Sequence, residues 1–297
     1  MKRMDNRGIA LVLTLMVVAI ITAMVVEFAY GVYVSTNALH NWKTSQQLSL
    51  AARSATELGA RLVAEKYAGK AAVLGPLEIS QKIPFDELEG TITVRIEDEN
   101  ARFNIRNIGV TAIIQDRAAY DAFGRLLEAL NLNPEIADRL VDWVDADSIP
   151  NRSDIADVEM SAKNAPLDSI DELLSIPGID QETFDRLKPY VTIYGSNQIN
   201  LNNAEVPVLM SLHENIDKGM AENITRYRQI TPFQSPMDLQ KVGGVPQNLS
   251  TALAGSAIAS NTFRIVATAT SGDMKRIIES VMDISGSTRT VRYWREY

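Results

Sequence analysis

The chain opens with a long apolar segment. Residues 9 to 26, eighteen in all, carry no charged side chain, and apolar residues continue beyond Glu27. As a helix this segment rises about 27 Å, close to the thickness of the hydrocarbon core of a bilayer. A secretory signal peptide would have a shorter apolar run with a small-residue cleavage site after it. The pattern therefore predicts a retained membrane-spanning helix.

Helical periodicity continues past the apolar segment. Apolar side chains recur at spacings of three and four residues, which places them on one face of a helix. They are Leu48, Ala51, Ala55, Leu58 and Leu62. No proline occurs between Ile9 and Gly75. The spacing predicts one helix from Ile9 to about Ala68, roughly 90 Å long, apolar in its first half and amphipathic in its second.

Strand patterns lie on both sides of a long helical block. After a predicted break at residues 69 to 84, the stretch TITVRIEDENARFNIRN (91 to 107) predicts two strands with a turn at Asp98-Glu99-Asn100. Strand alternation returns near the C-terminus, in 262–271, 275–285 and 289–297. Between them, helical patterns run through 118–130, 134–144, 170–175, 181–187, 204–212, 220–229 and 236–241.

The economical architecture is an α+β fold. It has a long N-terminal transmembrane and amphipathic helix, an antiparallel sheet, and a large inserted all-α domain. The expected divisions are residues 1–8, a transmembrane half at 9–30, the amphipathic helix and first strands at 31–107, the inserted helical domain at 108–260, and the last strands at 261–297.

The basic residues at the N-terminus predict the orientation of the membrane anchor, and the net charge limits the classes of partner. Three basic residues (Lys2, Arg3 and Arg7) precede the apolar segment, so the N-terminus is expected in the cytoplasm and the remainder across the membrane. The 297 residues carry a net charge of -8, which disfavours nucleic acid as a partner. No cysteine occurs, which excludes a thiol metal site, and the two histidines lie too far apart in the sequence to suggest a paired metal motif. No motif predicts an enzyme.

Two stretches of the helical block resemble helix-hairpin-helix motifs. Each places a short turn between two short helices: Pro177-Gly178-Ile179 in the first, and Gly243-Gly244 in the second. Asp168 or Ser169 is expected to cap the leading helix of the first motif, and Ser235 that of the second. Such turns bind a DNA phosphate where basic side chains surround them. Residues 164 to 195 hold two basic and six acidic residues, so a structural, protein-contacting role is favoured over DNA binding.

An acidic stretch begins within the second predicted helix of the block. Residues 138 to 172 hold ten acidic and three basic residues. Calcium takes six to eight oxygen ligands, often from a loop of this kind. The alternative is a solvated acidic loop. The candidate calcium ligands are Asp142, Asp145, Asp147, Asp154, Asp157 and Glu159.

The N-terminus resembles that of type IV prepilins and pseudopilins. In that family a short basic leader ends in glycine, and a prepilin peptidase cuts after it on the cytoplasmic side. The resemblance implies a cut between Gly8 and Ile9, with methylation, and retention of the apolar helix. Most pilins then have glutamate as the fifth residue, where it neutralises the amine of the next subunit. Here that residue is Leu13, which marks a subunit at the end of a filament.

The missing glutamate and the helical insert together resemble the K-type minor pseudopilins of type II secretion (general secretion pathway protein K family). Residues 142–147, DWVDAD, and 164–167, NAPL, match that family, which binds calcium in this domain; the segment from Ser153 to Glu159 departs from its pattern. The resemblance implies a subunit at the pseudopilus tip that contributes to protein export across the outer membrane. Its expected partners are the I and J minor pseudopilins, the prepilin peptidase and other secretion components, including the outer-membrane secretin. Its expected location is the bacterial inner membrane, with a periplasmic C-terminal domain.

Two alternatives share these features. A membrane-anchored DNA receptor of the competence type has an anchor and a helix-hairpin-helix element, and the stretch from Ile199, INLNNAEVPVLMSL, resembles the segment that precedes the motif in such receptors. A minor pilin of a type IV pilus differs mainly in the machine that it serves.

Overall fold

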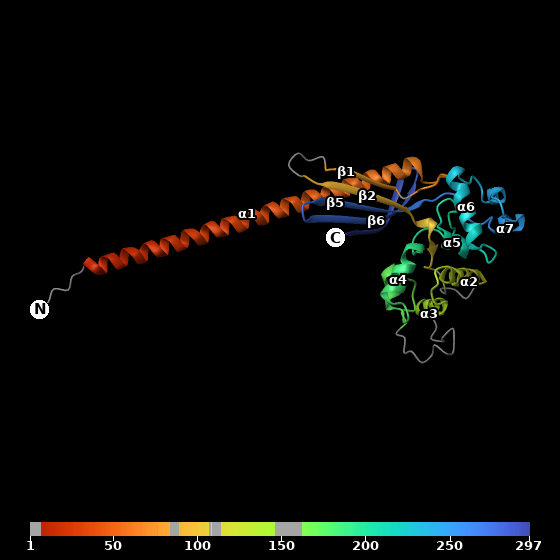
Figure 1. Cartoon of the computed structure of the whole chain (residues 1–297), viewed down its shortest axis with the longest axis horizontal. Helices are drawn as coiled ribbons and strands as arrows, with labels where there is room; N and C mark the ends of the chain where they lie inside the picture. The colour runs from red at the N-terminus through yellow and green to blue at the C-terminus, as the bar shows by residue number, and fades with distance from the viewer. Residues whose placement is uncertain (1–6, 76, 84–88, 107, 109–113, 146–161) are drawn as a thin grey trace.

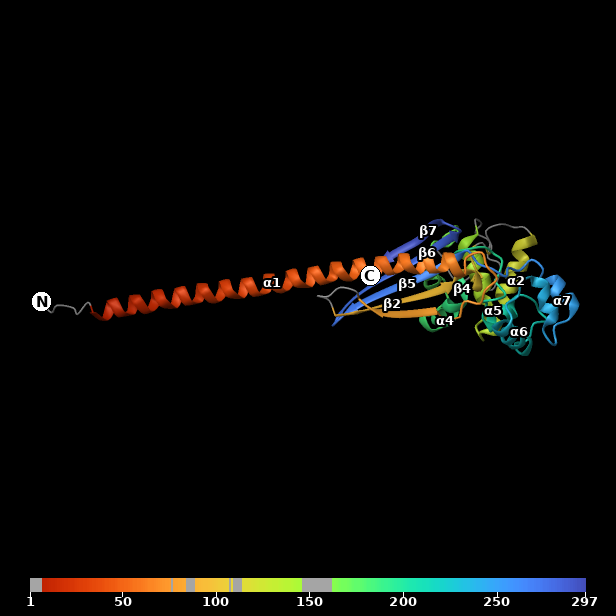
Figure 2. The same ribbon diagram turned by 90° about the horizontal axis from the view of Figure 1, so that it is seen from above.

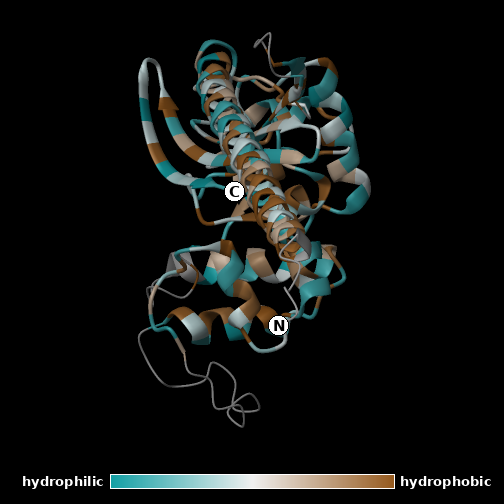
Figure 3. Ribbon diagram, turned by 90° about the vertical axis from the view of Figure 1, so that its left-hand side faces the viewer, coloured by the Kyte–Doolittle hydropathy of each residue, from teal (hydrophilic) through white to brown (hydrophobic). Residues whose placement is uncertain are grey.

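The computed structural model describes residues 7–75, 77–83, 89–106, 108, 114–145 and 162–297. Helix α1 (Arg7–Lys66) is one continuous helix, as predicted, and it projects far from the rest of the molecule (Figure 1). Viewed nearly end-on, α1 is predominantly hydrophobic toward its N-terminus (Figure 3). Among the described residues, α1 is the one helix long and apolar enough to cross a membrane.

The second half of α1 packs on the sheet (Figure 2). The buried residues of this half, including Leu48, Ala52 and Val63, form the face that meets the sheet. Gly59 lies at a close approach of the two, because a Cβ there would be 3.2 Å from both Ile265 Cγ2 and Val94 Cγ1. The small alanines and this glycine let the helix settle closely on the β-branched side chains of the strands.

The main sheet is antiparallel and five-stranded, in the order β1-β2-β5-β6-β7. Its strands are β1 (Leu77–Lys82), β2 (Thr91–Asp98), β5 (Thr262–Ser271), β6 (Met274–Ser285) and β7 (Thr288–Glu296). The three C-terminal strands and β2 were predicted. Strand β1 lies inside the region expected as a break, so that expectation was wrong there. It is an edge strand, mostly exposed, and so lacks the apolar run that identifies a buried strand.

The helical region lies at the end of the molecule far from the N-terminus (Figure 1). Its α-helices are α2 (Ile114–Ala129), α3 (Glu135–Val144), α4 (Gln181–Leu187), α5 (Val206–Ser211), α6 (Lys218–Ile230) and α7 (Gln247–Ala252). The 3-10 segments η2 (Ile170–Ser175), η3 (Lys188–Tyr190) and η4 (Pro236–Lys241) connect them. A core of its own, around side chains such as Phe123, Leu140 and Leu209, is separate from the core between α1 and the sheet.

The second predicted strand of the 91–107 stretch has an unexpected partner. After η1 (Glu99–Ala101), β3 (Phe103–Asn104) leaves the main sheet and pairs in parallel with β4 (Val191–Thr192). Phe103 is buried in the helical core, stacked on Phe123 with ring centroids 5.9 Å apart. The chain therefore enters the helical region at β3, one short turn after the end of β2.

Candidate functional site

A buried carboxylate lies at the junction between the sheet and the helical region. Asp98, at the end of β2, is 6% exposed. Its Oδ2 atom accepts hydrogen bonds from Asn200 Nδ2 (2.9 Å), Asn203 Nδ2 (2.6 Å) and Ser260 Oγ (2.6 Å). Its Oδ1 atom accepts the backbone N–H of Asn100 at 2.9 Å. Burial raises the pKa of Asp98 above its ordinary value, and these donors oppose the rise.

Three asparagines of one turn provide most of this junction. Besides its bond to Asp98, Asn200 Nδ2 donates to Ser260 Oγ at 2.8 Å. Asn202 is fully buried, and its amide donates to the carbonyls of Phe233 and Ile258, both at 2.9 Å. Asn203 accepts the N–H of Leu74 at 2.7 Å. The turn thus connects the helical region to the chain that leaves α1 and to the chain that returns to β5.

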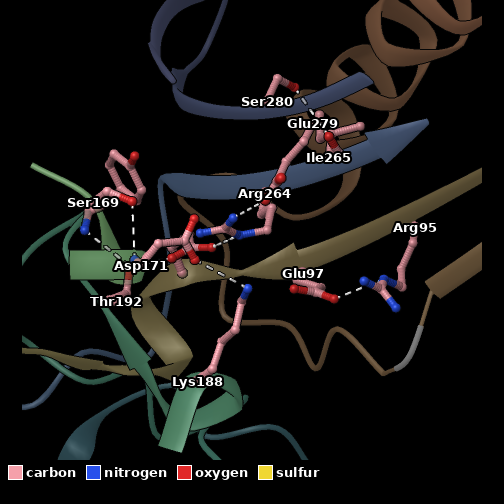
Figure 4. A network of polar contacts seen from close by, with 12 residues as sticks. Arg95, Glu97, Ser169, Asp171, Lys188, Thr192, Arg264, Ile265, Glu279 and Ser280 are labelled. Atoms are coloured by element: carbon pink, nitrogen blue, oxygen red, sulfur yellow. Dashed lines mark hydrogen bonds and ion pairs between the residues drawn. The ribbon is translucent and has the colours of Figure 1, made fainter. Parts of the chain in front are cut away.

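The next residue, Glu99, is the centre of an ionic network. It is fully buried, and its Oε1 accepts from Arg264 Nε of β5 at 2.6 Å and from Arg102 Nη1 at 3.1 Å. Its other oxygen accepts the hydroxyl of Thr192 in β4. Burial favours a raised pKa, but the two guanidinium groups outweigh it and the pKa of Glu99 lies below its ordinary value. Figure 4 shows Arg264 also bound to Glu279 of β6.

These contacts fix the helical region to the rest of the molecule. Ser260, which binds Asp98, also accepts the N–H of Gly69 through its carbonyl at 2.8 Å, just past the end of α1. The end of α1, the end of β2, the asparagine turn and the start of β5 therefore meet around one carboxylate. Each polar group so buried must be satisfied, because an unsatisfied one costs about 1–3 kcal/mol. The arrangement holds the helical region in one orientation relative to α1.

The two predicted hairpin turns differ in their surroundings. In the first, the carbonyl of Pro177 accepts a bond from Arg139 Nη1 of α3 at 2.7 Å, and Ile179 is buried. Gly178 has φ +86°, and a Cβ there would lie 2.0 Å from Arg139 Nη1. In the second, Gly243 and Gly244 are exposed, with open space around them. The predicted caps are confirmed, because Ser169 and Ser235 each form a capping box.

The candidate calcium ligands fall mostly outside the described residues. These are Asp147, Asp154, Asp157 and Glu159. Asp142 lies on α3 and Asp145 caps its C-terminus, both half-buried. The described chain on either side of the gap meets here, because Asn164 N–H donates to the Trp143 carbonyl at 3.0 Å. Within the residues that the structure describes, no three acidic or histidine side chains gather as a metal site would require.

The predicted processing residues lie at the start of α1. Gly8 is in its first turn, and Ile9 and Leu13 are 52% and 56% exposed. Leu13 lies in the uncharged run of residues 9 to 26. The helix places this run at the end of the molecule opposite the helical region (Figure 1).

Comparison with known proteins gives a consistent result. Residues 101–196 match the family model for type II secretion system protein K, and residues 195–257 match a helix-hairpin-helix motif. Type II secretion system protein K of Pseudomonas aeruginosa PAO1 is 28% identical, with 94% of this chain and 89% of that protein covered. The protein of the same name from Pectobacterium carotovorum is 25% identical, with 96% and 94% covered.

A solved structure shares the fold. One chain of the crystal structure of the GspK–GspI–GspJ complex, from the type 2 secretion system of enterotoxigenic Escherichia coli, matches with a TM-score of 0.66 and 18% identity. The match covers 88% of this chain and 99% of that one. An apolar N-terminal helix on an antiparallel sheet, with a helical region containing a helix-hairpin-helix motif, gives the chain a GspK-like fold. Over most of its length the chain is similar to proteins of the type II secretion system protein K family.

Proposed function

We propose that this protein is the minor pseudopilin at the tip of the type II secretion pseudopilus, where it contributes to protein export across the outer membrane. The observation that carries the proposal is the junction around Asp98, which holds a bulky helical region at the far end of α1. A subunit of this shape offers α1 to subunits beside and below it, and it opposes addition above. The role is structural, not catalytic.

The expected arrangement follows from the helix. Residues 9 to 30 of α1 span the inner membrane with a cytoplasmic N-terminus, and the sheet and helical region lie in the periplasm. Prepilin peptidase cuts between Gly8 and Ile9. I-type and J-type minor pseudopilins pack against the exposed side of α1, which carries Leu39 and Leu58 at more than 60% exposure. Burial of a leucine against a partner contributes ~1.5–3 kcal/mol.

Cysteine cross-linking tests the arrangement, because the chain has no cysteine of its own. Leu39→Cys on α1 should cross-link to cysteine-bearing I-type or J-type pseudopilins in cells. Ile230→Cys, at the end of α6 and 82% exposed, is the matched control and should not. The reverse pattern, or no cross-link at Leu39, would contradict tip placement. Leu13→Glu should leave the pattern unchanged if the shape of the helical region, and not the missing charge, fixes the position.

A calcium site in the helical region is a second part of the proposal. Asp142 and Asp145 provide carboxylate oxygens at the end of α3, the kind of ligand that calcium prefers. Bound calcium would neutralise an acidic stretch and hold it against the helical core. Millimolar calcium, but not magnesium, should raise the unfolding temperature of the full-length protein, and the double variant Asp142→Asn/Asp145→Asn should lose that increase. No increase with calcium would refute the site.

The helix-hairpin-helix match also allows a test of the competing DNA-receptor function. The first turn is occupied by Arg139, and the region around it is acidic. We therefore expect no binding of duplex DNA at low salt, the condition in which a protein that contacts the DNA phosphates binds DNA most tightly. Salt-sensitive DNA binding that is lost on changing Gly243 and Gly244 would favour the receptor.

A further inference from the structure

A cleft lies between the sheet and the helical region, on the face of the sheet opposite α1. It encloses about 490 Å³, within the range of sites that bind small molecules or short peptide segments. Its floor comes from β2, β5, β6 and β7, and its wall from η2, α4, η3 and β4. Figure 4 shows side chains of the floor and the wall reaching toward one another. Neither the family match nor the tip position assigns it a ligand.

The cross-strand register arranges the floor in rows. Arg95 of β2 is opposite Val266 of β5, which is opposite Glu279 of β6. In the next row, Glu97 is opposite Arg264. Acidic and basic side chains thus both occur in each row of the floor. Among the described residues that line the cleft, four are acidic and four are basic, so their formal charges cancel.

The charges of the cleft already have partners. Arg95 pairs with Glu97 at 2.9 Å, and Arg264 with Glu99 and Glu279. On the wall, Lys188 pairs with Asp171 at 3.6 Å. A charged ligand at Arg264, whose side chain is 14% exposed, would have to displace Glu99 or Glu279 and leave it in a partly desolvated place, which offsets what the ligand gains. The cleft therefore suits a ligand without net charge that offers hydrogen-bond donors and acceptors.

Three tyrosines also line the cleft and can contribute to recognition of an uncharged ligand. Tyr194 comes from the helical region, and Tyr293 and Tyr297 from β7 and the C-terminus. The rings of Tyr194 and Tyr293 lie 6.2 Å apart across the boundary between the two parts. The hydroxyl of Tyr297 donates to Glu279 Oε2 at 3.4 Å. Tyrosine and arginine are the side chains enriched where proteins bind other proteins.

The same rings argue against a sugar. Stacking of a sugar needs an open aromatic face, but the Arg264 guanidinium lies over the Tyr194 ring at 5.9 Å, and Arg295 lies over Tyr297 at 4.6 Å. An extended peptide needs no such face. Its backbone offers a donor and an acceptor at every residue, and apolar lining side chains such as Ile170 and Val266 can receive its side chains.

We propose that this cleft binds an extended, uncharged segment of a partner polypeptide. The proposed function is needed only to say where the partner comes from. With α1 at the centre of the pseudopilus, the cleft faces outward, where exported proteins can reach it. Uncharged stretches can occur in proteins of any net charge, so such a site suits many different proteins.

Peptide probes test the proposal with the full-length protein in nanodiscs. The fluorescent probes are an acetylated hexapeptide, (Ser-Val)₃, and its (Lys-Val)₃ and (Glu-Val)₃ counterparts, with maltotriose as competitor. Only the uncharged peptide should bind at sub-millimolar concentration, and maltotriose should not displace it. Tyr293→Ala should weaken binding at least tenfold, and Tyr293→Phe less. Ile230→Ala, outside the cleft, should have no effect.

A second variant tests the charge argument without disturbing the core. Asp171→Ala removes an exposed carboxylate and leaves Lys188 without it, so the variant should gain severalfold affinity for (Glu-Val)₃. Tighter binding of a charged peptide to the unaltered protein, displacement by maltotriose, or the same affinity in Tyr293→Ala would each overturn the proposal. These results are independent of the cross-linking at Leu39, so the failure of one proposal is distinguishable from failure of the other.

Discussion

Asn200 and Asp98 are 102 residues apart in the chain, yet the side-chain amide of Asn200 donates a 2.9 Å hydrogen bond to the buried Asp98 carboxylate. This bond joins the helical region to the end of a strand of the main sheet. Asn200 Oδ1 also accepts the N–H of Asn202 at 3.0 Å, so one side chain serves both the junction and its own turn.

Replacement of Asn200 should therefore destabilise the junction. Asn200→Ala removes two donors and leaves the Asn202 N–H buried without its acceptor. We expect a loss of about 1–3 kcal/mol in the free energy of unfolding, measured by urea denaturation. Asn248→Ala, at an exposed asparagine of α7, is the matched control and should change little. Equal effects of the two variants would show that the junction is not a stabilising element.

The two neighbouring carboxylates should respond to acid in opposite ways. The pKa of Glu99 is lowered on folding, so its contribution is present above pH 4.5 and is lost as the pH falls through the folded value. The pKa of Asp98 is raised, so folding takes up a proton above pH 3.8, and its contribution to stability increases as the pH falls through this window.

Variants separate the two contributions. Glu99→Gln should cost roughly 3–5 kcal/mol at neutral pH, because it removes one partner of a buried ion pair, and should make the acid loss of stability shallower. Asp98→Asn should make that loss steeper than in the unaltered protein. The measurement is urea denaturation from pH 3 to 7. If the free energy of unfolding falls equally steeply with acid in both variants, the opposite pKa shifts assigned to Glu99 and Asp98 are wrong.

Much of this fold could be predicted from local pattern, but the junction could not. Spacing of three and four residues gave α1, and strict alternation gave β5, because each element repeats one local relationship along its length. Asp98, in contrast, belongs to a run of polar residues that predicts only a turn. Its burial depends on Asn200 and on Ser260, which is 162 residues away in the chain. The repeated asparagines near Asn200 were the available signal, and their resemblance to a DNA receptor concealed their structural role.

The two glycine turns allow a matched comparison. Gly178 and Gly244 have φ values of +86° and +90°, so alanine at either costs ~1–2 kcal/mol in backbone strain. Only at Gly178 does the new Cβ meet Arg139. Gly178→Ala should therefore destabilise by about 1–3 kcal/mol more than Gly244→Ala. This additional destabilisation by Gly178→Ala should vanish when Arg139 is also replaced by alanine, which a double-mutant cycle measures. If it persists, contact with Arg139 is not its cause.

The proposed processing at the N-terminus should depend on a single small residue, Gly8. Gly8→Leu should leave residues 1 to 8 attached, because a bulky side chain replaces the glycine at the proposed cleavage point. Mass spectrometry of the N-terminus, in cells that contain prepilin peptidase, measures the outcome. Gly31→Leu changes a glycine in the same helix and should be processed normally. A Gly8→Leu protein that starts at Ile9 would refute the prepilin interpretation.

The packing of α1 on the sheet makes Gly59 far more sensitive than Gly31. A Cβ at Gly59 already meets Ile265 and Val94 at 3.2 Å, whereas a Cβ at Gly31 meets nothing within 4 Å. Gly59→Leu must push α1 away from the strands, and overpacking of this kind costs ~1–3 kcal/mol, more than the ~1 kcal/mol that leucine gains over glycine in a helix. Gly59→Leu should thus lower the stability of the sheet domain in urea denaturation, whereas Gly31→Leu should not lower it. If the two variants unfold alike, then α1 and the sheet are not packed as tightly as these distances require.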